Sequence, residues 1–140
     1  MIHHLGSSMD RQTDVLLQDK FNIGFSQFKI LLALREQNAV NQLSIAKYLG
    51  QTEASVSRQI KLLIGMGLIS SRKNPANRRQ AITTLTPRGS HVITQATNAL
   101  EIHYAPMFSQ LSPAQLDAFS KVLDSLHVRI CSTGLPGSCN

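Results

Sequence analysis

Hydrophobic residues recur at intervals of three and four along most of the chain, a spacing typical of amphipathic helices. Two short stretches, Leu68–Lys73 and Gln80–Leu85, are instead rich in β-branched residues and are joined by turn formers, which predicts a β-hairpin. Helices are expected over Asp10–Lys20, from Ser26 up to Gln37, over Asn41–Gly50 and Glu53–Met66, from Pro87 to about Phe108, and after Ser112. The pattern therefore predicts a mainly α-helical fold with one small hairpin.

Polar residues at helix starts and a glycine at a helix end mark the boundaries of the central helices. Ser26, Asn41 and Thr52 are each placed to cap the following helix, because their side-chain oxygens can accept a hydrogen bond from a first-turn N–H group. Gly50 can end the third helix, since glycine adopts the left-handed conformation without strain. A tight turn should therefore separate the third and fourth helices.

These two helices are expected to differ in the faces that they leave free. The inward residues are expected to be Leu43, Ala46 and Tyr48 or Leu49 in the third helix, and Val56, Ile60 and Leu63 in the fourth. The fourth helix would turn hydroxyl, amide and basic side chains mainly outward, namely Ser55, Arg58, Gln59 and Lys61.

The last two helices carry equally clear start signals. Thr86 followed by Pro87 supplies an N-cap and a proline at the first helical position, and Ser112 with Gln115 forms a capping box. Their apolar stripes are Val92, Ala96, Ala99 or Leu100, His103 and Met107 on the long helix, and Leu116, Phe119, Val122, Leu123 and Leu126 on the last.

Length and composition fit a single domain over residues 1–140. Hydrophobic residues make up 42% of the chain and aromatic residues 5%, so the core is expected to consist of aliphatic side chains, as in packed helices. No run approaches the roughly 18 apolar residues that span a bilayer, and the start lacks a signal-peptide pattern. We therefore expect a cytoplasmic protein with no membrane partner, ending in a loose tail at residues 131–140.

Positive charge is concentrated in one third of the sequence. Between Leu43 and Ser90 there are eight basic residues and one acid, Glu53, whereas the rest of the chain has six basic and seven acidic residues. Such a segment is suited to face a polyanion. A short helix, a tight turn, a second helix with basic and hydroxyl residues outward, and a basic hairpin together form an arrangement that can read double-stranded DNA.

Several stretches in this region resemble the MarR family of winged helix-turn-helix transcriptional regulators. They are Leu43–Leu49, Ser55–Arg58, Leu63–Ile69, Arg72, Asn77–Arg79 and Leu85–Gly89, within a resemblance that covers roughly Gly24 to Ile93. The resemblance implies a DNA-binding lobe at residues 24–90 and dimerisation helices at residues 1–23 and 91–130. It further implies a bacterial homodimer that represses promoters carrying an inverted repeat, with a small-molecule effector that relieves repression.

The resemblance also implies roles for individual residues. Base edges and phosphates would be faced by Ser55, Ser57 and Arg58, with Gln59 and Lys61 at the margin. Arg78, at the tip of the hairpin or wing, would enter the minor groove, where a narrow groove concentrates negative potential. Arg72, Lys73 and Arg79 would contact the DNA backbone or support the hairpin.

The chain departs from the family pattern in two places. Asn77 stands where the family usually has an acidic residue before the paired wing arginines, which removes an ion-pair partner for them. Ile64 and Met66 stand where charged residues usually end the recognition helix. These two side chains are expected either to face the first helices or to form an apolar surface.

Metal and thiol chemistry have weaker support. His91 and His103 are twelve residues apart, roughly 18 Å along a helix, and so cannot share a metal ion without other elements. His103 is expected to be a core or interface residue.

Arg129 lies close enough to Cys131 to favour a reactive thiolate, but Cys131 and Cys139 both lie near the end of the chain, where inert free thiols are expected.

Catalysis has less support still. The sequence has no glycine-rich phosphate loop, no Gly-x-Ser-x-Gly motif and no tight cluster of carboxylates or metal ligands. We therefore expect no enzymatic activity and no cofactor. The remaining alternatives are a winged-helix module for protein–protein interaction and a non-specific DNA-binding protein. Strongly salt-dependent binding to duplex DNA would separate the regulator from the protein-interaction module.

Overall fold

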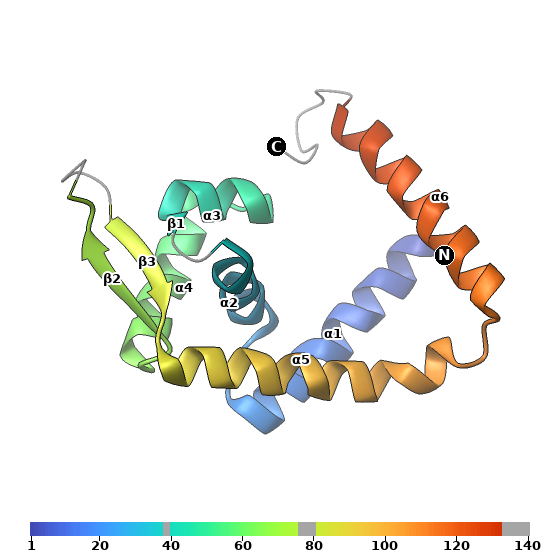
Figure 1. The fold of residues 1–140 in the computed structure, drawn as a ribbon, viewed down its shortest axis with the longest axis horizontal. Coiled ribbons are helices and arrows are strands. Elements are labelled where there is room, and N and C mark those ends of the chain that lie inside the picture. Colours follow the sequence, from blue (N-terminus) through green and yellow to red (C-terminus); the bar gives the residue numbers. More distant parts are fainter. Residues whose placement is uncertain (38–39, 76–80, 133–140) are drawn as a thin grey trace.

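The computed structural model describes residues 1–37, 40–75 and 81–132 of the chain (Figure 1). Its elements are α1 (Ile2–Phe21), α2 (Phe25–Gln37), β1 (Val40–Asn41), α3 (Gln42–Leu49), α4 (Glu53–Gly65), β2 (Ile69–Lys73), β3 (Ala81–Leu85), α5 (Pro87–Phe108) and α6 (Pro113–Ser132). The strands form one antiparallel sheet in the order β1-β3-β2. The prediction of a mainly helical fold with a small hairpin is therefore confirmed.

The molecule has a compact lobe at one end and an open arrangement of helices at the other (Figure 1). The lobe contains α2, α3, α4 and the sheet. The long α5 helix runs from the sheet along the whole molecule, passes beside α1 and leads into α6. A side-chain contact ties α1 to α5, because the Tyr104 hydroxyl donates to the Met9 carbonyl (3.0 Å) and lies 2.7 Å from the buried Thr13 hydroxyl.

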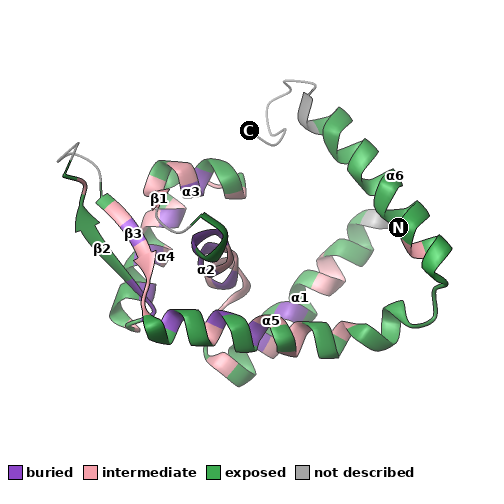
Figure 2. Ribbon diagram, viewed as in Figure 1, coloured by how far each residue is buried: buried purple, intermediate pink, exposed green. Residues whose placement is uncertain are grey.

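The hydrophobic core lies in the lobe and along the first half of α5 (Figure 2). It is built from the inner faces of α2, α4 and α5, joined by residues from α1, α3 and β2. Its fully buried members include Leu17, Ile30, Leu31, Leu34, Ile45, Val56, Leu63, Leu68 and Ile93. This single core, to which α1 and α5 also contribute, fixes α3, α4 and the hairpin relative to one another.

The first two helices begin elsewhere than predicted. The first helix starts at Ile2 rather than Asp10, and the second at Phe25, so Ser26 lies inside the helix and is not its cap. The N–H groups at this start find other partners: Gly24 N–H donates to Gln27 Oε1 (2.9 Å), and Phe25 N–H donates to Asp14 Oδ1 of α1 (2.7 Å). The start of α2 is thus set by a tertiary contact.

The short strand β1 was not predicted either. Val40 pairs with Thr83 and Asn41 with Ile82, which adds a third strand to the hairpin. This pairing joins the segment before α3 to the sheet, and Asn41 then caps α3 as predicted, its Oδ1 accepting from Ser44 N–H (2.8 Å).

The junction between the hairpin and α5 is closely packed. Thr86 caps α5 as predicted, since its Oγ1 accepts from Gly89 N–H (3.0 Å), and Pro87 occupies the first turn. The Thr86 hydroxyl donates to the Gly67 carbonyl (2.8 Å), and Thr86 N–H donates to the Leu68 carbonyl (3.1 Å). Gly89 lies directly against this carbonyl, and a Cβ there would overlap its oxygen and lie 2.9 Å from its carbon. Only glycine fits at this position without movement.

The outer half of α5 and nearly all of α6 are exposed within the chain. On α5, Val92, Ala96 and Leu100 pack inward as predicted, but His103 and Met107 are exposed, so His103 is not a core residue of this chain. The capping box of α6 is present, since Ser112 N–H donates to Gln115 Oε1 (2.8 Å). The apolar stripe of α6 faces solvent, apart from the half-buried Leu116 (Figure 2).

The end of α6 lies beyond the boundary that the sequence predicts. Helix α6 continues to Ser132, into the segment predicted to be loose, and residues 133–140 lie outside the part of the chain that the structure describes. Within the described residues, no helix combines the length and the apolar character that a membrane crossing requires.

Candidate nucleic-acid interface

Helices α3 and α4 are joined by the tight turn that the sequence predicts. Gly50 ends α3 with φ of 60°, and its N–H donates to the Lys47 carbonyl (3.2 Å), while Gln51 N–H donates to the Ala46 carbonyl (2.9 Å). Thr52 then caps α4, because its Oγ1 accepts from Ser55 N–H (3.2 Å). The two caps leave three residues between the helices and set the geometry of a helix-turn-helix.

The inner face of α3 is shifted from the one predicted. Ile45 and Ala46 are buried and Leu49 packs against the core, whereas Leu43 and Tyr48 are exposed. The exposed Tyr48 hydroxyl donates to Glu36 Oε2 of α2 (2.7 Å), and this hydrogen bond to a carboxylate, aided by burial, raises the pKa of Tyr48. The prediction that Leu43 faces the core was therefore wrong, and of the two alternatives Tyr48 and Leu49 it is Leu49 that packs inward.

Helix α4 divides into the two faces that its sequence predicts. Val56, Ile60 and Leu63 are buried in the core. On the remaining surface, Arg58 and Lys61 are exposed, and the flanking Ser55, Ser57 and Gln59 are partly exposed. The structure therefore brings all five predicted α4 residues to the accessible side of one helix.

Helix α4 also exposes apolar side chains that the sequence analysis did not select. Ala54 and Leu62 are exposed beside Arg58, and Leu62 keeps 51% of its surface accessible. Their spacing of four residues on either side of Arg58 was the signal that could have identified them. Of the two residues that depart from the family pattern, Met66 packs against the core, while Ile64 is 42% exposed.

The hairpin supplies a second basic surface. Arg72 and Lys73 are exposed at the end of β2, where they pair with Ile82 and Ala81 of β3. The Ser70 and Thr84 hydroxyls, 3.0 Å apart, link the two strands nearer the base. Asn77, Arg78 and Arg79, which carry the prediction of a minor-groove contact, lie outside the described residues.

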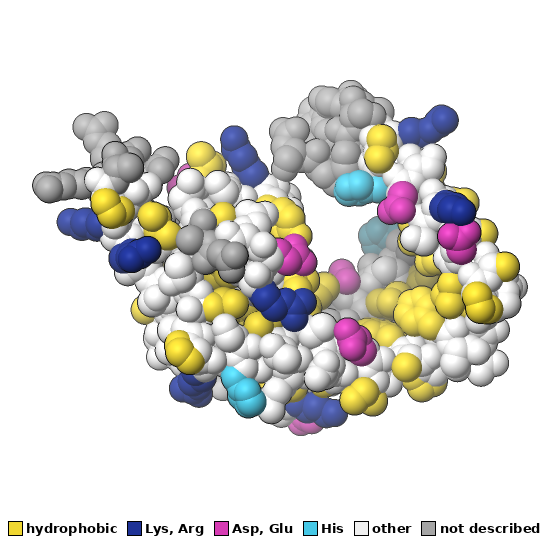
Figure 3. All heavy atoms as spheres, viewed as in Figure 1, with side chains coloured by type: hydrophobic (Ala, Val, Ile, Leu, Met, Phe, Trp, Pro, Cys, Tyr) yellow, Lys and Arg dark blue, Asp and Glu magenta, His cyan; other side chains and the backbone are white. Residues whose placement is uncertain are grey.

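The charges on the described part of the lobe are strongly unequal in sign. From residue 43 to 90 the described residues include one acid, Glu53, against the six basic residues Lys47, Arg58, Lys61, Arg72, Lys73 and Arg88. Basic side chains are visible on the hairpin in Figure 3, whereas hydrophobic side chains gather between α6 and the end of α5. The two ends of the molecule are thus suited to different kinds of partner.

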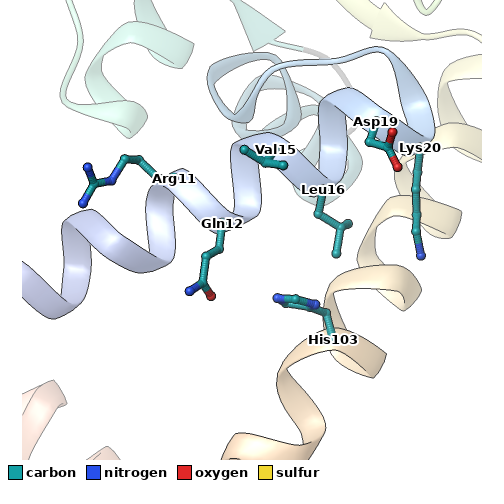
Figure 4. Close-up of a pocket in the computed structure, with 7 residues that line it drawn as sticks. All are labelled: Arg11, Gln12, Val15, Leu16, Asp19, Lys20 and His103. Carbon is teal, nitrogen blue, oxygen red and sulfur yellow. The ribbon is translucent and has the colours of Figure 1, made fainter.

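A groove of about 570 Å³ lies between α1 and α5, away from the helix-turn-helix. Figure 4 shows Gln12, Leu16 and Lys20 pointing from α1 toward α5, where His103 lies opposite them. The groove thus combines an apolar wall with the basic side chains of Arg11 and Lys20, the His103 imidazole and one carboxylate, Asp19. Among the described residues no set of three or more histidine, cysteine, aspartate or glutamate side chains is arranged to hold a metal ion.

Comparison with known proteins agrees with this geometry. Residues 25–81 match the family model described as the MarR family. MarR from E. coli in its apo form is 20% identical with a TM-score of 0.76, the alignment covering 89% of this chain and 92% of that one. A mutant E. coli MarR complexed with operator DNA is 20% identical with a TM-score of 0.79, covering 89% of each chain.

A third similar structure is that of BpsR from Bordetella bronchiseptica. It is 26% identical with a TM-score of 0.72, covering 89% of this chain and 97% of that one, and it was described for the regulation of BpsR DNA binding by 6-hydroxynicotinic acid. No curated protein matches this sequence. The predicted winged helix-turn-helix fold is therefore confirmed.

Proposed function

The chain carries a MarR-family winged helix-turn-helix domain at residues 25–81, and from this premise we propose that it is a sequence-specific DNA-binding transcriptional regulator. In this proposal it acts as a homodimer in the bacterial cytoplasm, represses promoters that carry a pseudo-palindromic operator, and catalyses no reaction. Each subunit places α4 in the major groove and its wing against the adjacent backbone and minor groove.

The accessible face of α4 is the observation that carries the proposal. Arg58 and Lys61 are exposed on it, while Ser55, Ser57 and Gln59 lie at its sides and can donate or accept hydrogen bonds. An arginine in the major groove can make a bidentate contact with the O6 and N7 atoms of guanine. Arg58 is therefore assigned the main base contact, and Lys61 a phosphate contact at the edge of the groove.

The wing is assigned to the DNA backbone and minor groove. Arg72 and Lys73 are exposed on β2, at the end of the strand from which the chain continues to Arg78 and Arg79. We assign Arg78 to the minor groove on the basis of the sequence resemblance, with Arg72, Lys73 and Arg79 as contacts to phosphates or supports for the hairpin.

Selection of bound DNA tests this function. Genomic fragments that bind the purified protein would be sequenced, and the enriched site measured by fluorescence anisotropy at several salt concentrations. We expect a shared inverted repeat and an affinity that falls steeply with salt, since bound Lys and Arg side chains release condensed counterions. Arg58→Ala should weaken binding by ~1–3 kcal/mol, whereas Arg35→Ala, at an exposed position of α2 outside the residues assigned to DNA or to the dimer contact, serves as a control of equal charge.

Each alternative outcome has a distinct meaning. Salt-dependent binding without a common sequence would replace the regulator by a non-specific DNA-binding protein. Absence of binding even at low salt would refute DNA binding and favour the protein-interaction module. Enriched sites that lie away from promoters, or an unchanged transcript level on deletion of the gene, would contradict the role as a repressor.

Support for the homodimer comes from the apolar surface of α6. Phe119, Val122, Leu123 and Leu126 form one stripe, and each keeps about half of its surface exposed in the isolated chain, from 46% to 56%. An apolar stripe of this kind gains stability only when another surface covers it. Residues 1–23 and 91–130 are accordingly assigned to the contact between two subunits.

Sedimentation velocity tests the dimer. We expect a species of twice the 15.4 kDa chain mass. Leu123→Asp should shift it to the monomer, because a carboxylate on the covered stripe would be desolvated. Ser125→Asp adds the same charge on another side of α6 and is the matched control. A monomeric wild-type protein at micromolar concentration, or a dimer that Leu123→Asp leaves unchanged, would refute this part of the proposal.

Regulation by a small molecule is assigned to the groove between α1 and α5. Lys20 and His103 could bind a carboxylate there while Leu16 contacts an aromatic ring, which fits a small aromatic acid of the kind that regulates BpsR. Titration calorimetry with 6-hydroxynicotinic acid and benzoate tests the assignment. Binding that Lys20→Gln weakens while Lys121→Gln does not would support it, and no heat of binding with either acid would contradict it.

A further inference from the structure

The exposed ridge of α4 has an apolar residue on each side of its central arginine. Ala54, Arg58 and Leu62 follow one another at intervals of four residues, so their side chains lie along one line on the helix surface. All three are exposed, and Leu62 retains 51% of its surface. The helix therefore offers a methyl group, a guanidinium group and an isobutyl group in sequence along the face assigned to DNA.

Leu62 does not belong to the packing of the lobe. The inner face of α4 is formed by Val56, Ile60 and Leu63, and Met66 at the end of the helix packs against the same core. Leu62 lies on the other side, one turn beyond Arg58. Leu62 therefore gains further burial energy only from a partner outside the chain, and a surface that covers it would lie one helical turn from Arg58.

We propose that Ala54 and Leu62 contact the 5-methyl groups of thymines on either side of the guanine contacted by Arg58. This inference rests on the proposed function and specifies which bases the operator half-site must contain. The thymine methyl is the apolar group that A·T pairs present in the major groove, and apolar side chains are its usual contacts. The two ends of the ridge thus contact thymine methyl groups, and its centre contacts the hydrogen-bond acceptors of guanine.

The spacing of the ridge sets the spacing of the bases. Residues four apart are about 6 Å apart along a helix axis, and successive bases on one DNA strand are about 3.4 Å apart. For a helix that follows the groove, each apolar contact therefore falls about two base pairs from the central guanine. The expected half-site has a G·C pair with a thymine on one strand or the other about two positions away on each side.

Replacement of single thymines by deoxyuridine tests the contacts, because deoxyuridine pairs as thymine does and lacks only the methyl group. Each substitution would be placed in the selected operator and its affinity measured by anisotropy at fixed salt. The guanine partner of Arg58 is located as the position where 7-deazaguanine weakens binding of the wild type but not of Arg58→Ala. We expect two methyl-dependent positions in each half-site, each costing about fourfold in affinity, or about 0.8 kcal/mol.

Variants of the protein then assign each methyl to a side chain. Leu62→Ala should abolish the deoxyuridine penalty at one position and Ala54→Gly the penalty at the other, with folding of each variant checked by circular dichroism at the assay temperature. Ile64→Ala is the matched control, because Ile64 is 42% exposed on the same helix but points about 160° away from Leu62. It should keep both penalties.

The possible failures are distinguishable. A selected inverted repeat in which no deoxyuridine substitution weakens binding, or penalties that persist unchanged in Leu62→Ala and Ala54→Gly, would overturn the methyl contacts and leave the regulator intact. A protein that selects no common sequence would remove the proposed function and this inference together.

Discussion

Among the described glycines, Gly89 is the one at which an added methyl group would lie closest to the backbone of a neighbouring segment. The first turn of α5 passes over the Leu68 carbonyl, which accepts from Thr86 N–H (3.1 Å), while the Thr86 hydroxyl donates to the adjacent Gly67 carbonyl (2.8 Å). A Cβ at position 89 would overlap the oxygen of the Leu68 carbonyl, lie 2.9 Å from its carbon and lie 3.3 Å from Leu85 Cδ2. Because the main obstacle is backbone, Gly89→Ala must move α5 away from β2.

The expected cost follows from the contacts that this movement breaks. The two hydrogen bonds that Thr86 donates to the Gly67 and Leu68 carbonyls contribute about 0.5–1.5 kcal/mol each, and the N-cap from Thr86 to Gly89 contributes about 1 kcal/mol. Gly89→Ala should therefore lower the free energy of unfolding by about 2–4 kcal/mol, a large part of the ~5–15 kcal/mol typical of a domain. The small helix-propensity gain of alanine offsets less than about 1 kcal/mol of this.

Urea denaturation followed by far-ultraviolet circular dichroism measures the effect, at one fixed protein concentration because association would add to stability. With a slope of about 2 kcal/mol per molar urea, the midpoint should fall by about 1–2 M. Gly65→Ala is the matched control, since a Cβ at the end of α4 meets nothing within 4 Å. If Gly89→Ala unfolds at the wild-type urea midpoint, the close packing of α5 on the Leu68 carbonyl does not contribute to the free energy of unfolding.

Three further perturbations test the cap of α4, the wing and the hydrogen bond between α3 and α2. Thr52→Ala should lower the free energy of unfolding by about 1 kcal/mol through loss of the α4 N-cap. Thr94→Ala, which removes a mid-helix hydroxyl, should change this free energy by less than about 0.5 kcal/mol. Equal effects of the two substitutions would contradict the stabilising role of the cap. Arg72→Ala should reduce the slope of log affinity against log salt by about 0.9, and an unchanged slope would remove Arg72 from the phosphate contacts. Glu36→Gln should lower the raised pKa of Tyr48, seen by ultraviolet titration of tyrosinate. Because that pKa is raised in the folded state, the Tyr48 hydrogen bond stabilises the protein below the unfolded-state pKa and is lost as pH rises through the folded-state value.

Local signals in the sequence were sufficient wherever a helix boundary depends on nearby residues. Asn41, Thr52 and Thr86 all cap the helices that follow them, and Gly50 ends α3 in the left-handed conformation. Each of these features involves atoms within a few residues of one another, so composition and spacing alone identify them. The outward face of α4 was likewise predictable from its helical period.

Features that depend on distant contacts were not predictable in the same way. The start of α2 is fixed by Asp14 of α1, and β1 exists because Val40 and Asn41 pair with β3. The exposure of Leu43 in α3 has the same origin, since a short helix with apolar residues on several sides is oriented by its neighbours. Leu62 was not predicted as a surface contact residue, because an apolar residue in a helix is usually assigned to the core.

The hydrogen bond between Tyr104 and the Met9 carbonyl makes the outer end of α5 a pivot point, so that a small rotation there produces a larger displacement at the other end of the helix. It anchors α5 to α1 near one end, and the arm from Tyr104 to Pro87 is about 26 Å long at 1.5 Å per residue. A rotation of about 8° about that point would carry the Pro87 end of the helix through about 3.4 Å, the rise of one base along a DNA strand. Since Thr86 and Gly89 join this end to the hairpin and α4, a small change in the angle between α1 and α5 would shift the proposed DNA contacts by about one base pair.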